Sequence, residues 1–370
     1  MRGAAIAGCA WRTPLGSTIE TAMARLYAGE RAAMTDPRGG YACTTIAPIR
    51  DEPARSRNSR FLRRMGLFGL EVAIEALGTS GVGGGARVGL FSGVGGLRVH
   101  WDDMIAAFVG QRDDGERMWE RGLCNVHPYW MLRHLSNNVH ALASAELDLR
   151  GEGATFGGAN GGAQALASAI RALHDSAIDA AVVVAYDSLL EPETLVELAA
   201  RGGATLAGVD ALVAPYTPGA NGFVPGEAAA ALVLVRERAG APTIAVRDAA
   251  GPDALARCAA LATGDIGLVD GAAHGSPDRD RAERAMLDGL REVIEQPVVL
   301  TAITATMGHL GAATSLVQAI ALAEMLRAGT ASPIAGHAGA TATSIRTRAA
   351  LGLSAGAPEL AAAIRIEVPA

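Results

Sequence analysis

Short and almost continuously apolar runs recur along this chain, and they constrain its fold more than any other feature. The clearest are ARVGLFS at 86–92, AAVVVA at 180–185 and AAAALVLV at 228–235. A strand that is buried on both faces reads as such a run, because neither side of it meets water. Longer segments with helical periodicity separate these runs. This alternation predicts an α/β fold.

The same reading predicts the order of the elements and one boundary between them. Further strands are expected at 4–8, 243–246, 265–270, 298–303 and 362–368. Helices are expected at 17–28, 62–77, 163–173, 279–294 and 312–328. The charged junction at 236–242 contains glycine and proline, and it favours two α/β halves, residues 1–238 and 239–370, joined in one integrated fold.

Composition excludes several classes of protein. Half of the 370 residues are hydrophobic and 19% are charged, which argues against a disordered chain. The net charge of -6 argues against a nucleic-acid or anionic-membrane partner. All 32 basic residues are arginines, so no lysine can form a Schiff base or hold a phosphate in a P-loop. With no signal peptide or membrane span apparent, we expect a cytoplasmic protein.

No cofactor or metal ion is expected from the sequence. The four cysteines stand far apart, without a CxxC pair, and are interpreted as free thiols. His127, His134 and His140 share one segment, but their spacing does not present three zinc ligands on one face. The acids at 278, 280 and 283 are interpreted as charges that stabilise a helix N-terminus.

The strongest local motif is GEGATFGGANGGAQ at 151–164, where a buried strand is expected to pass through a glycine-rich turn into a helix. Glycines permit a strained turn, and the helix N-terminus stabilises negative charge on the residue at its apex. That residue is Asn160, which is no nucleophile. From local evidence alone, a tight crossing with a capping asparagine is the favoured explanation of the motif.

Two histidines follow expected strands in similar surroundings. His274 lies in GAAHGS at 271–276, and His309 lies in TMGHLGAA at 306–313. Small neighbours leave each imidazole uncovered at the carboxyl end of a strand, which is where ligand crevices of α/β sheets form. We expect the two histidines to share one site.

Taken together and in this order, these motifs resemble those of the β-ketoacyl synthases of type II fatty-acid and polyketide systems, which belong to the thiolase-like superfamily. The opening strand with TPLG at 13–16, the strand VGLFSGVGG at 88–96 and GFVPGEAA at 222–229 resemble signature segments of that family. The two histidine motifs resemble its AHGT and GHxxGAAG motifs. The resemblance implies a duplicated five-layer α-β-α-β-α fold, normally dimeric, that acts on acyl chains carried by an acyl carrier protein.

The resemblance also implies roles for single residues. The acyl-accepting cysteine of active members falls on Asn160, and their two histidines fall on His274 and His309. Phe156, Thr304 and Ser354 fall beside the expected substrate. Active members carry a lysine at the position of Thr304, and a glycine-rich gating loop at 352–357 has lost its bulky residue.

These departures argue against ordinary condensation, because an amide cannot form the thioester. The chain resembles a chain length factor, a cysteine-less subunit that pairs with an active ketosynthase and shapes its acyl pocket. A malonyl-carrier-protein decarboxylase, a non-condensing acyltransferase that uses Asn160, His274 and His309, and a binding protein without an acyl role stay open as alternatives. Whether the chain is an enzyme is left undecided.

The expected partners are acyl carrier protein and either a ketosynthase subunit or a second copy of the chain. Large side chains gather near the expected interface, and they are His127, Tyr129, Trp130 and Met131. Aromatic residues and methionine are typical of interface cores. The strand at 180–185 is expected to build that interface.

Overall fold

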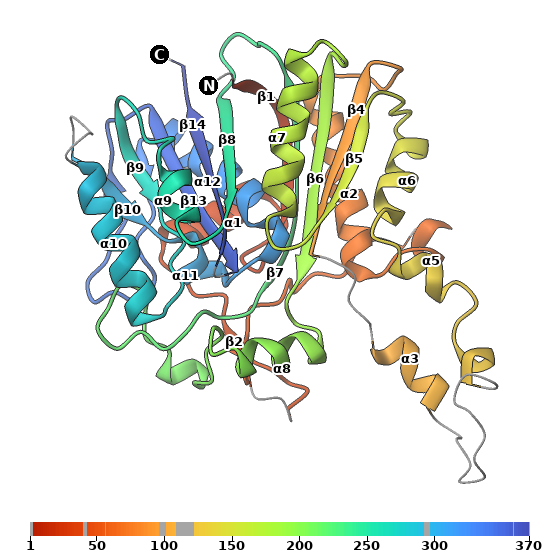
Figure 1. Cartoon of the computed structure of the whole chain (residues 1–370), viewed down its shortest axis with the longest axis horizontal. Helices are drawn as coiled ribbons and strands as arrows, with labels where there is room; N and C mark the ends of the chain where they lie inside the picture. The colour runs from red at the N-terminus through yellow and green to blue at the C-terminus, as the bar shows by residue number, and fades with distance from the viewer. Residues whose placement is uncertain are drawn as a thin grey trace.

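In the described residues of this computed structural model, a ten-stranded sheet runs through the molecule (Figure 1). The structure describes residues 3–39, 43–55, 57–95, 101–108, 122–291, 297–357 and 359–369. The first five strands of the sheet are β1 (Ala4–Arg12), β4 (Val88–Val94), β5 (Gly153–Gly157), β6 (Ala180–Ser188) and β7 (Glu227–Val235). The last five are β8 (Thr243–Ala250), β9 (Ile266–Asp270), β10 (Val299–Thr301), β13 (Ala349–Ala357) and β14 (Leu360–Glu367).

The two sets of five strands have the same topology. Their spatial orders are β1-β7-β6-β4-β5 and β8-β14-β13-β9-β10, so each set places its first, fifth, fourth, second and third strands in that sequence. In each set the last three of these are parallel to one another, and the first and fifth are antiparallel neighbours. Strand β8 pairs with β1 and joins the sets. The predicted α/β fold is confirmed, and the repeated topology shows its duplication.

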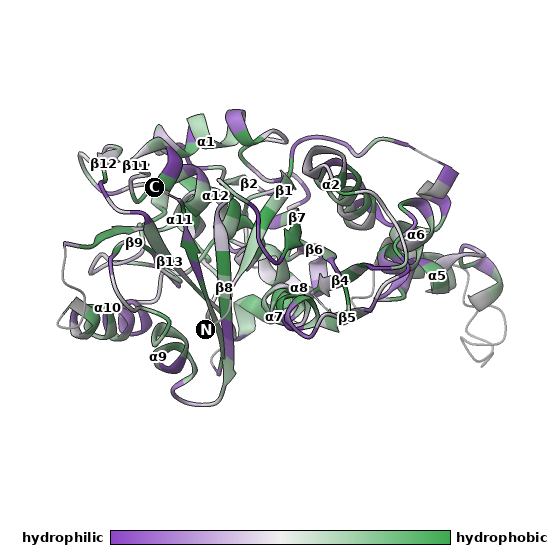
Figure 2. Cartoon of the chain, turned by 90° about the horizontal axis from the view of Figure 1, so that it is seen from above, coloured by the Kyte–Doolittle hydropathy of each residue, from purple (hydrophilic) through white to green (hydrophobic). Residues whose placement is uncertain are grey.

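Helices fill the space between the two halves of the sheet and cover its outer faces. The central pair is α7 (Gly161–His174) and α12 (Thr314–Ala328), whose buried residues join inward side chains of both halves in one core. The outer helices are α2 (Arg64–Ser80) and α6 (Asn138–Glu146) on the N-terminal half, and α9 (Ala254–Ala259) and α10 (Pro277–Arg291) on the C-terminal half (Figure 2). Three layers of helix therefore alternate with two of sheet.

Strand β6 shows why the apolar runs are continuous. Ala181, Val183 and Ala185 point into the central core, whereas Val182 and Val184 point into the core under α2. Both faces of the strand are covered over 180–185, which explains why that run is apolar throughout.

Shorter elements connect this frame. The helices are α1 (Ile19–Tyr27), α3 (Trp101–Phe108), α5 (Trp130–His134), α8 (Pro192–Ala200) and α11 (Ile303–Met307). Two small ladders pair β2 (Met34–Thr35) with β3 (Thr45–Ile46), and β11 (Thr330–Ala331) with β12 (Thr343–Ser344). Single 3₁₀ turns occupy Arg57–Arg60, Gly122–Asn125, Val209–Ala211 and Gly311–Ala313. No helix in the described residues is both long and apolar enough to cross a membrane.

The structure differs from the sequence predictions in two strands. Residues 352–357, expected as a loop, belong to β13, which pairs with β9 on one side and β14 on the other. The strand expected at the subunit interface, β6, is an interior strand, because β4 and β7 occupy both of its edges. The outermost strand on that side is β5, which pairs only with β4 among the described strands.

Candidate functional site

Asn160 lies where β5 passes into α7, as the motif predicts. Gly158 has a φ of +111° in the turn, a conformation that favours glycine. Gly162 lets the helix start against the C-terminal half, because a Cβ there would lie 2.3 Å from the carbonyl oxygen of Ala312. Asn160 occupies the N-cap position and is 6% exposed. A buried side chain at the start of a central helix is thereby held between the two halves.

The side chain of Asn160 does not cap the helix. No side-chain capping hydrogen bond forms at α7, and the Asn160 Nδ2 donates instead to the carbonyl oxygen of Ala361 on β14, at 2.9 Å. The interpretation of Asn160 as a capping residue is therefore wrong about its hydrogen bond, although Asn160 does occupy the N-cap position. A tertiary acceptor has replaced the local one, and the amide fastens the turn to the C-terminal half.

His309 is clasped between the segment before β7 and the start of α12. Its backbone N–H donates to the carbonyl of Val224 at 2.8 Å, and its Nδ1 accepts from the N–H of Gly311 at 3.1 Å. The second ring nitrogen, Nε2, faces the carbonyl oxygen of Ala355 at 3.5 Å, and the ring of Phe223 lies 4.9 Å away between centroids. The segment at 222–229 is therefore a support for His309.

His274 follows β9 and is 8% exposed. Its Nδ1 is buried and has no hydrogen-bond partner within the described residues. Burial, with smaller contributions from His309 and Arg279, lowers the pKa of His274 to about 3. The imidazole is thus neutral at pH 7, and it lies close enough to His309 to sense that ring.

The hairpin of β13 and β14 connects Asn160 with His309. Asn160 donates to Ala361 on β14, and His309 faces Ala355 on β13, which is the adjacent antiparallel strand. His309 in turn contributes to the electrostatic environment of His274. The hairpin thus links Asn160 with His309, and a site shared by all three residues stays a prediction.

The three residues expected beside a substrate lie on separate elements. Phe156 is partly buried on β5 and packs against the central core. Thr304, on α11, is 6% exposed, and its hydroxyl donates to the carbonyl of Ala272 at 3.4 Å. The Ser354 hydroxyl lies 3.3 Å from that of Ser315 at the start of α12. Their contact with a substrate stays a prediction.

None of the four cysteines offers a replacement thiolate at the turn. Cys258 shares an acceptor with Asn160, because its Sγ donates to the same Ala361 carbonyl at 3.4 Å. Burial, aided by the charge of Asp248, raises the pKa of this thiol to about 11. The pKa of Cys9 is also raised to about 11, and that of Cys43 is raised, in both cases chiefly by burial. Cys124 is exposed in a 3₁₀ turn far along the chain from the motif.

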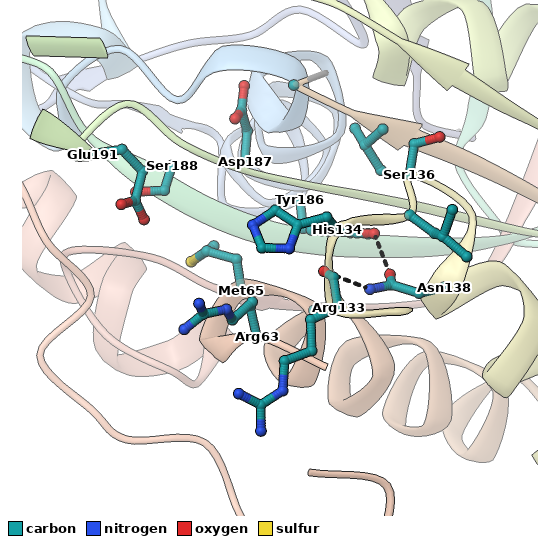
Figure 3. A pocket seen from close by; sticks show the side chains of 14 residues that line it. Arg63, Met65, Arg133, His134, Ser136, Asn138, Tyr186, Asp187, Ser188 and Glu191 are labelled. Carbon is teal, nitrogen blue, oxygen red and sulfur yellow. Dashed lines mark hydrogen bonds between the residues drawn. The ribbon is translucent and has the colours of Figure 1, made fainter. Parts of the chain in front are cut away.

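A further pocket opens at the carboxyl ends of β4 and β6 (Figure 3). His134 lies beside Tyr186 there, with Arg133 on the same side and Asp187 toward the other (Figure 3). The Tyr186 hydroxyl lies 3.5 Å from Asn138 Oδ1, and the Asn138 Nδ2 donates to the carbonyl of Arg133 at 3.1 Å. The segment that carries the expected interface residues therefore also lines a pocket in its own chain.

The residues expected at an interface lie on that same segment and are largely exposed. Met131 is 63% exposed and Tyr129 is 38% exposed, whereas Trp130 is half-buried and packs edge-on against His134. His127 is exposed beside Tyr129. Other exposed apolar side chains of this part of the chain are Ile105, Leu132 and Leu135.

Sequence reasoning missed two residues that the structure buries beneath His274. Tyr216 precedes the segment at 222–229, and Glu283 lies on α10. The acids of α10 were interpreted as helix-start charges, which suits the exposed Asp278. Asp280 and Glu283 are each 2% exposed and bind backbone amides of the His274 loop. Their spacing of three along one helix was the available signal.

The duplicated sheet, the central helices and the asparagine and histidine turns define a thiolase-like α/β fold. Sequence models of the family agree: the β-ketoacyl synthase N-terminal domain matches residues 1–239, and the C-terminal domain matches residues 237–337. The chain belongs to the β-ketoacyl synthase family.

Solved structures share the fold at low sequence identity. A β-ketoacyl synthase from Burkholderia phymatum STM815 gives a TM-score of 0.82 at 17% identity, with all of both chains covered. The ishigamide ketosynthase/chain length factor gives 0.81 at 16%, again with all of both chains covered. The ketosynthase from module 6 of the bacillaene synthase from Bacillus subtilis 168 gives 0.79 at 17%, covering all of this chain and 72% of that one. No curated protein matches the chain by sequence.

Proposed function

We propose that this chain is a non-condensing ketosynthase-like subunit that pairs with an active ketosynthase and shapes its acyl pocket, in the manner of a chain length factor. It would act in type II polyketide or fatty-acid-type biosynthesis, in the cytoplasm, on chains carried by an acyl carrier protein. The observation that carries the proposal is the hydrogen bond from Asn160 Nδ2 to Ala361. At the position of the nucleophile, the side chain holds two halves of the fold together.

The chemistry of the remaining residues supports the same role. An amide nitrogen is neither a thiolate nor convertible to one, so Asn160 cannot carry an acyl group as a thioester. The buried cysteines have raised pKa values and stay protonated, which leaves them poor nucleophiles. The position at which active members carry a lysine holds Thr304.

A partner surface is available on the N-terminal half. Strand β5 has a paired neighbour on one side only among the described strands, and an open strand edge is a template for pairing with another chain. Met131, Leu132 and Leu135 are 63%, 44% and 46% exposed on α5 and the turn after it. Aromatic and methionine side chains are enriched at the cores of protein interfaces. A ketosynthase subunit or a second copy of this chain would cover them.

One observation favours the alternative of a decarboxylase acting on malonyl-carrier protein. The buried Nδ1 of His274 has no hydrogen-bond partner within the described residues, and a neutral imidazole can stabilise a developing enolate oxygen. The same group would serve as the general base of a non-condensing acyltransferase. A purely structural subunit has no need of either function.

The proposal is tested by mixing the purified chain with an intact type II ketosynthase. Met131→Glu combined with Leu135→Glu should weaken their association at least about tenfold, because it places charge in an apolar contact. Val196→Glu is the matched control, since Val196 is 54% exposed on α8 and lies outside this segment. Sedimentation equilibrium measures the association.

The two enzymatic alternatives, a decarboxylase and a non-condensing acyltransferase, need a second measurement that is made on this chain alone. Release of carbon dioxide from malonyl-carrier protein by the wild type, abolished by His274→Ala, would establish the decarboxylase and overturn the pairing role. Equal association of the double variant and the control would instead remove this surface from the proposal.

A further inference from the structure

The loop that carries His274 rests on two buried carboxylates of α10. Glu283 accepts two hydrogen bonds from the loop, from the N–H of Ala272 to Oε1 at 2.7 Å and from the N–H of Ala273 to Oε2 at 3.2 Å. Asp280 accepts from the N–H of Gly275 at 3.1 Å. The two acids are three residues apart, so they share one face of the helix. The backbone on both sides of His274 is therefore tied to α10.

Tyr216 joins both carboxylates from a distant part of the chain. Its hydroxyl donates to Glu283 Oε2 at 2.9 Å and accepts from the N–H of Ala273 at 3.1 Å. Its own backbone N–H donates to Asp280 at 2.9 Å. The side chain is 9% exposed. One phenol thus completes a closed network beneath the residue that precedes His274.

The network holds a backbone conformation that alanine rarely adopts. Ala273 has a φ of +47° and Tyr216 has a φ of +62°, both in the left-handed region. Such residues persist only where their surroundings fix them. Ala273 directly precedes His274, so its backbone angles set the direction in which the imidazole leaves the loop.

The rest of the loop is fixed as well. The Thr304 hydroxyl donates to the carbonyl of Ala272, and the N–H of Gly222 donates to the carbonyl of Gly275 at 2.7 Å. Burial and the neighbouring Glu283 raise the pKa of Tyr216 well above its usual range, so the phenol keeps its proton. Burial raises the pKa of Glu283 to about 7. The neutral Tyr216 hydroxyl is therefore a suitable hydrogen-bond donor for the Glu283 carboxyl, and the chain has no lysine that could take its place.

We propose that Tyr216 is a positioning residue for His274. Its hydroxyl, bonded to Glu283 and to the Ala273 amide, holds the loop in a conformation in which the His274 Nδ1 has no hydrogen-bond partner among the described residues. This inference goes beyond subunit pairing, which needs no positioned histidine. It holds for His274 whether or not the chain associates with a ketosynthase.

Tyr216→Phe tests the proposal, because it keeps the ring and removes only the hydroxyl. The measurement is the rate at which diethyl pyrocarbonate modifies each histidine of the full chain, followed by peptide mass spectrometry at pH 7. The rate at His274 should rise at least about tenfold. His309, which is 7% exposed on the other loop, and the exposed His127 should change by less than about twofold.

Tyr27→Phe is the matched control, since the Tyr27 hydroxyl is buried without a hydrogen-bond partner in the described residues. It should leave the His274 rate unchanged. Glu283→Gln is the second variant, because an amide has one acceptor oxygen where the loop and Tyr216 use two; it too should expose His274 selectively. An unchanged His274 rate in both variants, or a parallel rise at His309 that signals general loosening, would overturn the proposal.

Discussion

The two halves of the molecule share one strand order but use the same topological position in opposite ways. After the second strand of the C-terminal half, β9, the chain forms a short loop whose amides are held by buried acids and which carries His274. After the second strand of the N-terminal half, β4, it continues to α3, where Ile105 is 49% exposed. After equivalent strands, the C-terminal half therefore encloses a polar site, whereas the next described helix of the N-terminal half presents an apolar side chain to solvent.

This difference shows which contacts fix the residues that follow the strands in each half. The C-terminal loop is fixed by contacts within the chain, from α10, from Tyr216 and from Thr304. On the N-terminal half, the large apolar side chains of Met131, Leu132 and Leu135 are exposed to solvent. Clusters of exposed apolar side chains mark interaction sites. The two halves share one strand order because the fold is duplicated, and they differ in the side chains that follow their strands.

The largest expected effect comes from restoring a nucleophile to the N-terminal half. Asn160→Cys places a thiol at the start of α7, where the helix dipole favours the thiolate. We expect condensation to stay at least about a hundredfold below that of an intact ketosynthase, because Thr304 stands where the family resemblance implies a lysine and the expected gate is part of β13. Product formation from acyl- and malonyl-carrier proteins measures this. Turnover like that of an ordinary ketosynthase would show that only the cysteine separates the two.

The next effect sharpens the contrast through the carboxylates of the C-terminal half. Burial raises the pKa of Glu283 to about 7 from an ordinary 4.5, so the folded chain holds this proton more tightly than the unfolded chain. Its contribution to stability is present below pH 4.5 and is lost as pH rises to about 7. Glu283→Gln removes the titration. The free energy of unfolding of the variant relative to the wild type should therefore rise between pH 5 and pH 8, by up to about 3 kcal/mol.

Urea unfolding across that pH range measures the difference. Asp270, whose pKa is raised to about 7, and His274, whose pKa is lowered, are present in both proteins and largely cancel in the comparison. Glu237→Gln, at an exposed position, is the surface control. A flat difference for Glu283→Gln would mean that its carboxyl titrates normally in the folded chain.

Most of the strands and helices could be predicted, because local patterns in the sequence indicate them. Strands β4, β6 and β7 were found because both of their faces are buried, which leaves a continuous apolar run. Strand β13 was missed because Gly352 and Ser354 lack the side chains typical of strands, and its conformation depends on β9 and β14. Tertiary pairing decided that segment.

The site was predictable only as far as its residues stand in motifs. Asn160 and the two histidines follow strands and are surrounded by small residues, which marks them in the sequence. The bond from Asn160 to Ala361 spans 201 residues, and the bond from Tyr216 to Glu283 spans 67. Neither leaves a local signal, since any buried polar group needs some partner and the sequence does not say which.

The smallest expected effect tests whether the N-terminal turn is fastened to the C-terminal half. Asn160→Ala removes the donor to Ala361 and leaves the weaker Cys258 thiol pointing to that carbonyl. The free energy of unfolding should fall by about 1–2 kcal/mol. Asn221→Ala is the surface comparison, because its Nδ2 donates at the same length, 2.9 Å, to the carbonyl of Ala211, and its Oδ1 also accepts from the N–H of Val213 at 3.1 Å. Loss of these two exposed bonds together should cost less than about 0.5 kcal/mol. Urea unfolding measures both variants, and equal losses would mean that the Asn160 bond adds no more than a surface contact, so that the two halves hold together without it.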